Sequence, residues 1–159
     1  MADDIETGEG DPEEVDPEAA ARAQAIVDSM RGKFLDWLKT TEGALVEHLT
    51  ALEPGVDALG GDASGATDRQ AVVEAVTVIA HEMRGLGGTF GYPLVTRVGA
   101  TLEDYLMERV DATAADVHII REHIAAVGEM RAAFAVDVDA AAERRLSEIA
   151  DQLEVLVGA

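Results

Sequence analysis

Apolar residues recur at alternating spacings of three and four along most of this chain, and this periodicity constrains the fold more than any other feature. Side chains with these spacings lie on one face of an α-helix. No run of β-branched residues alternates at period two, as it would in a half-buried strand, and only 4 prolines interrupt the pattern. The sequence therefore predicts an all-α protein, an antiparallel four-helix bundle with an additional or extended N-terminal helix.

The N-terminal helix is predicted to begin at Asp16-Pro17-Glu18, where an N-cap residue, a proline and an acidic residue follow one another. Its apolar stripe comprises Ile26, Met30, Phe34, Leu38, Leu45, Leu49 and Leu52. Gly32 and Gly43 lie along this stripe, so the segment is either one helix or two helices joined at a bend. The segment either completes the bundle or packs across one end of it.

The remaining helices have recognisable starts. A loop rich in Gly, Asp and Ser is expected over residues 54–66, and a capping box at Thr67-Asp68-Arg69-Gln70 then opens the second helix. Gly91-Tyr92-Pro93 breaks the chain and starts the third helix, whose stripe of apolar residues reaches Val110. The last two helices are expected to be capped by Thr113 with Asp116, and by Asp139.

Composition limits the classes of partner. Residues 1–15 are dominated by Asp, Glu and Gly and are predicted to be an acidic, disordered tail, whereas residues 16–159 form one bundle domain. The formal net charge of −20 repels phosphate backbones and anionic lipid, so neither nucleic acid nor a membrane is an expected partner. No secretory signal and no membrane-spanning segment is recognised, which makes a cytoplasmic location the expectation.

The second helix carries an unusual solvent face. Its predicted buried seam is Val72, Val76, Ile79, Met83 and Leu86. On the opposite side, His81 shares a face with Arg84, Gly85 and Gly88, because offsets of three, four and seven stack on a helix. Each glycine inside a helix costs about 0.8–1 kcal/mol relative to alanine. A sequence that keeps this cost, at Gly87 as well, is expected to need a bare backbone that a large partner can approach.

The residues on this face suit phosphoryl transfer. An ordinary histidine is mostly neutral at neutral pH and keeps a nitrogen lone pair, so an exposed His81 can act as a nucleophile. Arg84, one turn further on, can neutralise the oxygens of an incoming phosphoryl group. Phosphoryl transfer depends mostly on positioning and charge stabilisation, so the acceptor needs few residues if a partner supplies the metal and an aspartyl phosphate.

The stretch from His81 to Gly91 resembles the phosphohistidine motif of histidine-containing phosphotransfer (HPt) domains. The family pattern is His, Lys at the third position after it, Gly at the fourth, small residues at the fifth to seventh, an apolar residue and a closing Gly. Here these places hold His81, Arg84, Gly85, Leu86-Gly87-Gly88, Phe90 and Gly91. The next helix is also similar, at Leu94, Val98, Gly99, Leu102 and Glu103. The resemblance covers residues 71–110 by motif, with Arg84 in place of the usual lysine and Leu86 in place of a smaller residue.

This resemblance implies a function in bacterial two-component signal transduction. HPt domains are helical bundles that relay phosphate between receiver-domain aspartates, so His81 would be the phosphoacceptor of a phosphorelay protein and Arg84 its charge-neutralising neighbour. Gly85, Leu86 and Gly88 would contact the receiver domains of response regulators or hybrid histidine kinases. A polar residue on the third helix often orients the histidine, and Glu103 is the candidate, followed by Asp104. No cofactor or metal is expected, and the chain would be a carrier more than an independent enzyme.

The sequence leaves other functions open. The chain could instead be a helical adaptor or decoy that docks receiver domains without carrying phosphate, or a purely structural bundle. His48, His118 and His123 lack comparable neighbours and are expected to be structural or solvated. His81-Glu82-Met83-Arg84 begins like a zinc-protease motif, but an arginine stands where the second metal ligand is needed.

Overall fold

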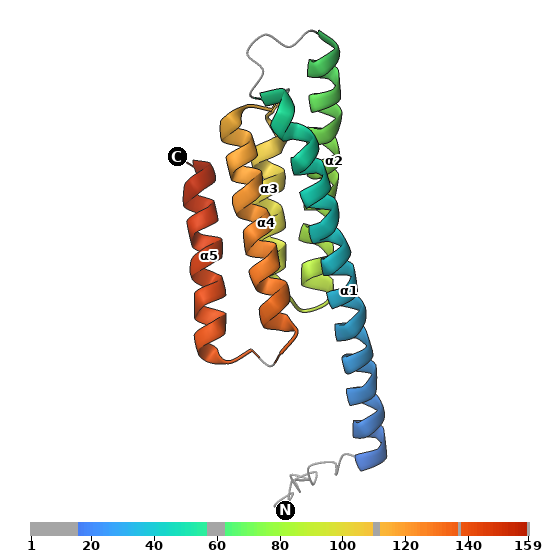
Figure 1. The fold of residues 1–159 in the computed structure, drawn as a ribbon. Coiled ribbons are helices and arrows are strands. Elements are labelled where there is room, and N and C mark those ends of the chain that lie inside the picture. The colour runs from blue at the N-terminus through green and yellow to red at the C-terminus, as the bar shows by residue number, and fades with distance from the viewer. Residues whose placement is uncertain (1–15, 57–62, 110–111, 137, 159) are drawn as a thin grey trace, which may run out of the picture.

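A computed structural model describes residues 16–56, 63–109, 112–136 and 138–158. The described residues are helical apart from short connections and contain no strand, which confirms the all-α prediction. The helices are α1 (Pro17–Val56), α2 (Ala63–Thr89), α3 (Pro93–Met107), α4 (Ala114–Phe134) and α5 (Ala140–Gly158). Each helix runs antiparallel to the next one along the chain (Figure 1). The predicted tail at residues 1–15 lies outside the described residues.

The helices α1 to α4 enclose a common core, and α5 packs against α3 and α4. The first helix therefore completes the bundle and does not cross its end. It is one helix of 40 residues, which settles the question of continuity at Gly32 and Gly43. No helix in the described parts of the chain has the length and apolar character that a membrane span requires.

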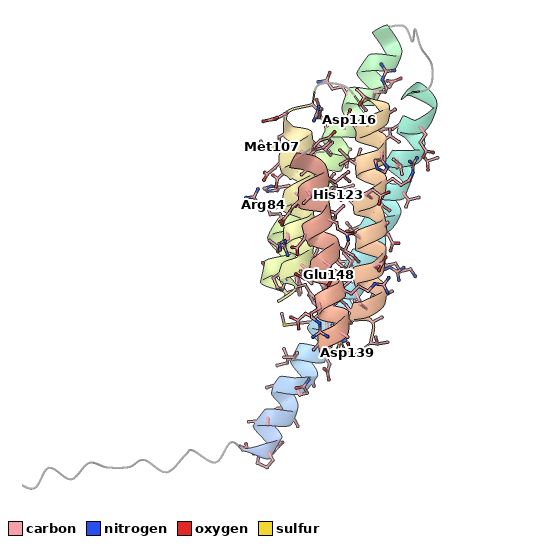
Figure 2. All side chains as sticks on the ribbon, turned by 90° about the vertical axis from the view of Figure 1, so that its left-hand side faces the viewer. Arg84, Met107, Asp116, His123, Asp139 and Glu148 are labelled. Atoms are coloured by element: carbon pink, nitrogen blue, oxygen red, sulfur yellow. The ribbon has the colours of Figure 1, made fainter. Side chains whose placement is uncertain are left out.

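The N-terminal part of α1 projects beyond the bundle (Figures 1 and 2). At about 1.5 Å per residue α1 is about 60 Å long, about twice the length of α4, so no other helix can cover all of it. Every residue from Asp16 to Met30 is exposed. The prediction that Ile26 and Met30 belong to the buried stripe is therefore wrong, and burial begins only at Phe34.

Helix boundaries differ from the prediction near the α1–α2 connection. The loop expected at residues 54–66 overlaps both helices, because α1 continues to Val56 and α2 begins at Ala63, and the part at residues 57–62 lies outside the described residues. Thr67 thus lies inside α2 instead of capping it. A formed helix extends at little cost through small residues, since each added residue gains one backbone hydrogen bond. The third helix ends at Met107, and Val110 lies outside the described residues.

The predicted caps of the last two helices are confirmed. Thr113 and Asp116 form a reciprocal capping box at the start of α4. The side chain of each residue accepts a hydrogen bond from the backbone N–H of the other. The Asp139 carboxylate accepts hydrogen bonds of 3.0 and 2.8 Å from the backbone N–H groups of Ala141 and Ala142. These bonds satisfy amides that have no partner within the helix.

Aromatic rings gather where α2 turns into α3. Phe34 stacks on Tyr92 with ring centroids 4.2 Å apart, and Phe90 and Phe134 pack against this pair. The turn itself needs Gly91, whose φ of +81° is in the left-handed region. The N–H of Tyr92 donates to the carbonyl of Gly87 across this turn, at 2.7 Å, and so closes the end of α2. The predicted chain break is therefore a packed corner.

His123 is fully buried in α4, inside the bundle (Figure 2). Its Nδ1–H donates to the carbonyl oxygen of Ile119 at 2.8 Å, while Nε2 has no partner. Burial lowers the pKa of His123, because the charged imidazolium would lose its hydration. Of the two expectations for this histidine, structural or solvated, its place in the core agrees with the first.

We expect acid to destabilise the protein partly through His123. Below about pH 6.5 the unfolded chain binds a proton at this histidine that the folded chain does not bind, so the free energy of unfolding falls as pH falls. A His123→Leu variant should lose less stability than the wild type between pH 7 and pH 5 in urea unfolding measurements. His118→Gln, at an exposed histidine of the same helix, is the control and should follow the wild type. Equal pH slopes for His123→Leu and the wild type would contradict this assignment.

Candidate functional site

His81 stands on the outer surface of α2, and 73% of its side chain is exposed. The buried residues of α2 around it are Val73, Val76, Ala80, Met83 and Gly87. The core face is therefore turned by about one residue from the predicted seam, since Val72, Ile79 and Leu86 are only half-buried. This rotation of the core face follows from the close packing of α3 along one side of α2. It leaves the histidine outward, but next to α3.

Two glycines allow α2 and α3 to approach closely. A Cβ atom at Gly99 of α3 would lie 2.6 Å from the backbone nitrogen of Arg84 and 2.7 Å from the carbonyl oxygen of Ala80. A Cβ at Gly87 of α2 would lie 2.6 Å from the backbone nitrogen of Thr96. Both distances are far inside van der Waals contact. The expectation that Gly87 stays bare for a partner protein is thus wrong, because its bare backbone is used within the bundle.

The close approach brings Glu103 of α3 under His81. Its Oε1 atom lies 2.8 Å from Nδ1 of His81, and its Oε2 atom accepts a bond of 3.2 Å from Arg84. Arg84 also donates to Asp104 at 3.4 Å. One carboxylate thus holds the imidazole and the guanidinium together. Asp104, the second candidate for orienting His81, contacts Arg84 instead.

The electrostatics of this carboxylate fix the state of the ring. Glu103 is 8% exposed, yet its pKa is lowered, chiefly by the hydrogen bond with His81 and further by Arg84, against the opposing effect of burial. An ionised carboxylate only accepts hydrogen bonds, so the proton of a neutral His81 ring is assigned to Nδ1. The Nε2 atom then carries the lone pair, and it lies on the side of the ring away from Glu103. A ring nitrogen with a free lone pair is therefore left on an exposed side chain.

The remaining predicted site residues surround the histidine unevenly. Gly85 is exposed, and a Cβ added there would meet no atom within 4 Å, whereas Gly88 is exposed with only Thr96 at 3.5 Å. Leu86 is half-buried. Arg84 is 50% exposed and lies on the side of the bundle formed by α2 and α3 (Figure 2). Open backbone thus lies C-terminal to His81 on the same face.

Comparison with protein-family models, curated proteins and solved structures found no match to this chain. In the residues that the structure describes, no group of three His, Asp or Glu side chains is placed to hold a metal ion. The function of this chain is therefore inferred from the geometry around His81.

Sequence reasoning missed two parts of this site. The sequence presents Asp104 as an alternative to Glu103, but the two carboxylates have different partners. Glu103 contacts both His81 and Arg84, whereas Asp104 contacts Arg84. Sequence reasoning also missed that Gly99 sets the spacing of α2 and α3. The sequence does hold a signal for this close packing. Gly99 lies between Val98 and Leu102, which are both buried, and a glycine inside a helix often marks a close helix contact.

Proposed function

We propose that this protein is a phosphorelay carrier of the HPt type, which accepts a phosphoryl group on His81 from a receiver-domain aspartate and passes it to another receiver. The observation that supports this best is the exposed imidazole whose Nδ1 is held by an ionised Glu103, 2.8 Å away. An imidazole whose Nδ1 is held by an ionised carboxylate, with the other ring nitrogen left open, suits a nucleophile. A cytoplasmic location and a two-component pathway belong to the same proposal.

The proposed transfer is a single displacement at phosphorus. Nε2 of His81 attacks the phosphorus of the aspartyl phosphate, the bond between phosphorus and the carboxylate oxygen breaks, and the aspartate carboxylate leaves with the electron pair. The ring keeps its proton on Nδ1 and becomes positively charged. Glu103 balances this charge through the hydrogen bond that is already formed. The reverse displacement on a second receiver returns His81 to its starting state.

Arg84 supplies the positive charge for the phosphoryl oxygens. Its guanidinium is held by Glu103 and Asp104, at 3.2 and 3.4 Å, and half of the side chain is exposed. A guanidinium has five N–H donors, so it can keep a carboxylate contact and still donate to phosphate. It needs little movement to meet a group on the neighbouring histidine. In this proposal Arg84 serves the acceptor side, as the lysine does in the resembling family.

The decisive experiment is phosphotransfer from a purified, phosphorylated receiver domain to the full chain. We expect label that is stable in alkali and lost in acid, as a phosphoramidate is and an acyl phosphate is not. Mapping should place it on the peptide with His81. Binding of the receiver without any label would contradict the carrier proposal and favour the adaptor or decoy. If the chain neither bound nor accepted phosphate from any receiver in a panel, that result would favour a purely structural bundle.

A bulky residue at Gly85 should block transfer without harming the fold. Gly85→Leu adds a side chain one turn from His81, at an exposed position with open space around it, so the melting temperature should stay the same or rise. Docking of a second protein over His81 is expected to fail, with at least about tenfold slower transfer, or about 1.4 kcal/mol.

Gly43→Leu is the matched control for this variant. Gly43 is also an exposed glycine inside a helix with nothing within 4 Å of an added Cβ, but it belongs to α1. This variant should transfer at the wild-type rate. If both leucine variants transferred normally, the partner would not approach along the Gly85 side of α2.

A further inference from the structure

The projecting part of α1 carries an uncovered apolar face. The side chains of Ile26, Val27 and Met30 are 61%, 56% and 44% exposed. With Ala20 and Ala23 these residues continue the stripe whose later members, from Phe34 onward, face the bundle core. We call the five residues Ala20, Ala23, Ile26, Val27 and Met30 the α1 overhang face. It is the same face of the helix, with the bundle missing opposite it.

Charge sets this segment apart from the rest of the chain. The whole chain has a formal net charge of −20. Residues 17–31 contain two acidic residues, Glu18 and Asp28, and two basic residues, Arg22 and Arg31, and therefore have no formal net charge. No residue of the α1 overhang face is ionisable. Two copies of this protein repel each other through their net negative charge, but residues 17–31 themselves add nothing to that repulsion.

We propose that the α1 overhang face pairs with the same face of a second copy, in an antiparallel arrangement about a two-fold axis. The spacing of three and four along this face is that of a coiled-coil seam. An antiparallel register places Val27 against the partner's Ala23, and Met30 against the partner's Ala20. Each large side chain thus meets a small one, and the two-fold axis repeats every contact. The partner's Ile26 then lies beside Ile26 near the axis.

The end of the bundle extends this interface. Arg31 donates to the carbonyl oxygens of Phe134 and Val136, at 2.8 and 2.5 Å, and so holds the α4–α5 connection against α1 just beyond Met30. Val136 and Val138 in this connection are 63% and 39% exposed. In the antiparallel register the first turn of the partner's α1 reaches this point. The coiled-coil seam alone is about 15 Å long, and these valines extend its apolar surface.

The size and charge of the face favour a second copy over an unrelated partner. The face offers no charged group for recognition, and its large and small residues are complementary to each other in the antiparallel register. The pairing also leaves the outer surface of α2 at His81 uncovered, because the overhang lies beyond the end of the bundle (Figure 1). The inference is independent of whether His81 carries phosphate.

Sedimentation velocity of the full chain from about 1 to about 500 μM, in about 0.15 M salt to screen the net charge, tests the pairing. We expect a reversible monomer–dimer equilibrium. Val27→Glu and Met30→Glu should each weaken the dimer at least about tenfold, since each would bury a charge in the seam. Val155→Glu is the control, because Val155 is 71% exposed on α5, and it should leave the equilibrium unchanged. Circular dichroism checks that each variant is folded.

Cysteine cross-linking tests the direction of the pair. The chain has no cysteine, so introduced thiols are the only ones present. A mixture of the Ala23→Cys and Val27→Cys chains should form a mixed disulfide dimer in air much faster than Ala23→Cys alone. A monomer at every concentration, a dimer that survives Val27→Glu, or equal cross-linking of Ala23→Cys with itself would overturn the proposal.

Discussion

His81→Gln is expected to abolish uptake of the phosphoryl group from a phosphorylated receiver domain. The amide of glutamine can still donate a hydrogen bond to Glu103, but it offers no nucleophilic lone pair at the position of Nε2. Because 73% of the His81 side chain is exposed, the free energy of unfolding should change by no more than about 0.5 kcal/mol. The measurements are the alkali-stable label and the melting curve of the same preparation.

His118→Gln is the matched control for this loss. His118 is also an exposed histidine on a helix, 3.7 Å from the carboxylate of Glu122, but it has no arginine on a shared carboxylate and no glycine face. This variant should take up label at the wild-type rate. A folded His81→Gln chain that still takes up label would place the acceptor elsewhere. A large loss of stability would instead assign His81 a structural role.

Gly99→Ala is expected to destabilise the protein by about 2–4 kcal/mol, although alanine is the better helix former. The new methyl group would lie 2.6 and 2.7 Å from backbone atoms of Arg84 and Ala80, which cannot rotate away as a side chain can. The helices α2 and α3 must therefore separate. For a chain of this length the melting temperature should fall by roughly 4–15 °C. Transfer should also slow, because the separation moves His81 away from Glu103.

Gly85→Ala is the comparison that isolates the packing effect. It makes the same chemical change at a helical glycine with nothing within 4 Å, so only the helix propensity acts and stability should rise by about 0.5–1 kcal/mol. Differential scanning calorimetry of the two variants measures the difference. If Gly99→Ala were as stable as Gly85→Ala, the close packing of α2 on α3 would not depend on the missing side chain.

Local rules in the sequence predicted much of this fold. The caps at Thr113 and Asp139 and the break at Gly91 depend on neighbouring residues only, and the structure confirms each of them. The outward position of His81 also follows from local spacing. The adjacency of Glu103 to His81 was inferred from a family resemblance, since spacing within one helix does not tell which residue of another helix faces it.

Features that depend on the relative lengths and spacing of helices could not be predicted in this way. The stripe of α1 has the same pattern at Met30, which is exposed, as at Phe34, which is buried, because the pattern does not tell where the neighbouring helices end. Likewise, helical spacing places Gly85 and Gly87 on different sides of α2, but it does not tell which side a neighbouring helix approaches closely. Only the path of α3 makes one of them open and the other tightly packed.

The carboxylate that joins His81 and Arg84 makes the arrangement of both side chains depend on one proton, that of Glu103 itself. If Glu103 were protonated, it would lose its attraction for the guanidinium, and the ring could no longer be held in a single tautomer. Because the pKa of Glu103 lies below the ordinary value of 4.5, this loss is deferred to more acidic solution. The carboxylate therefore stays ionised at neutral pH, where the two side chains are expected to operate as a single pre-aligned unit.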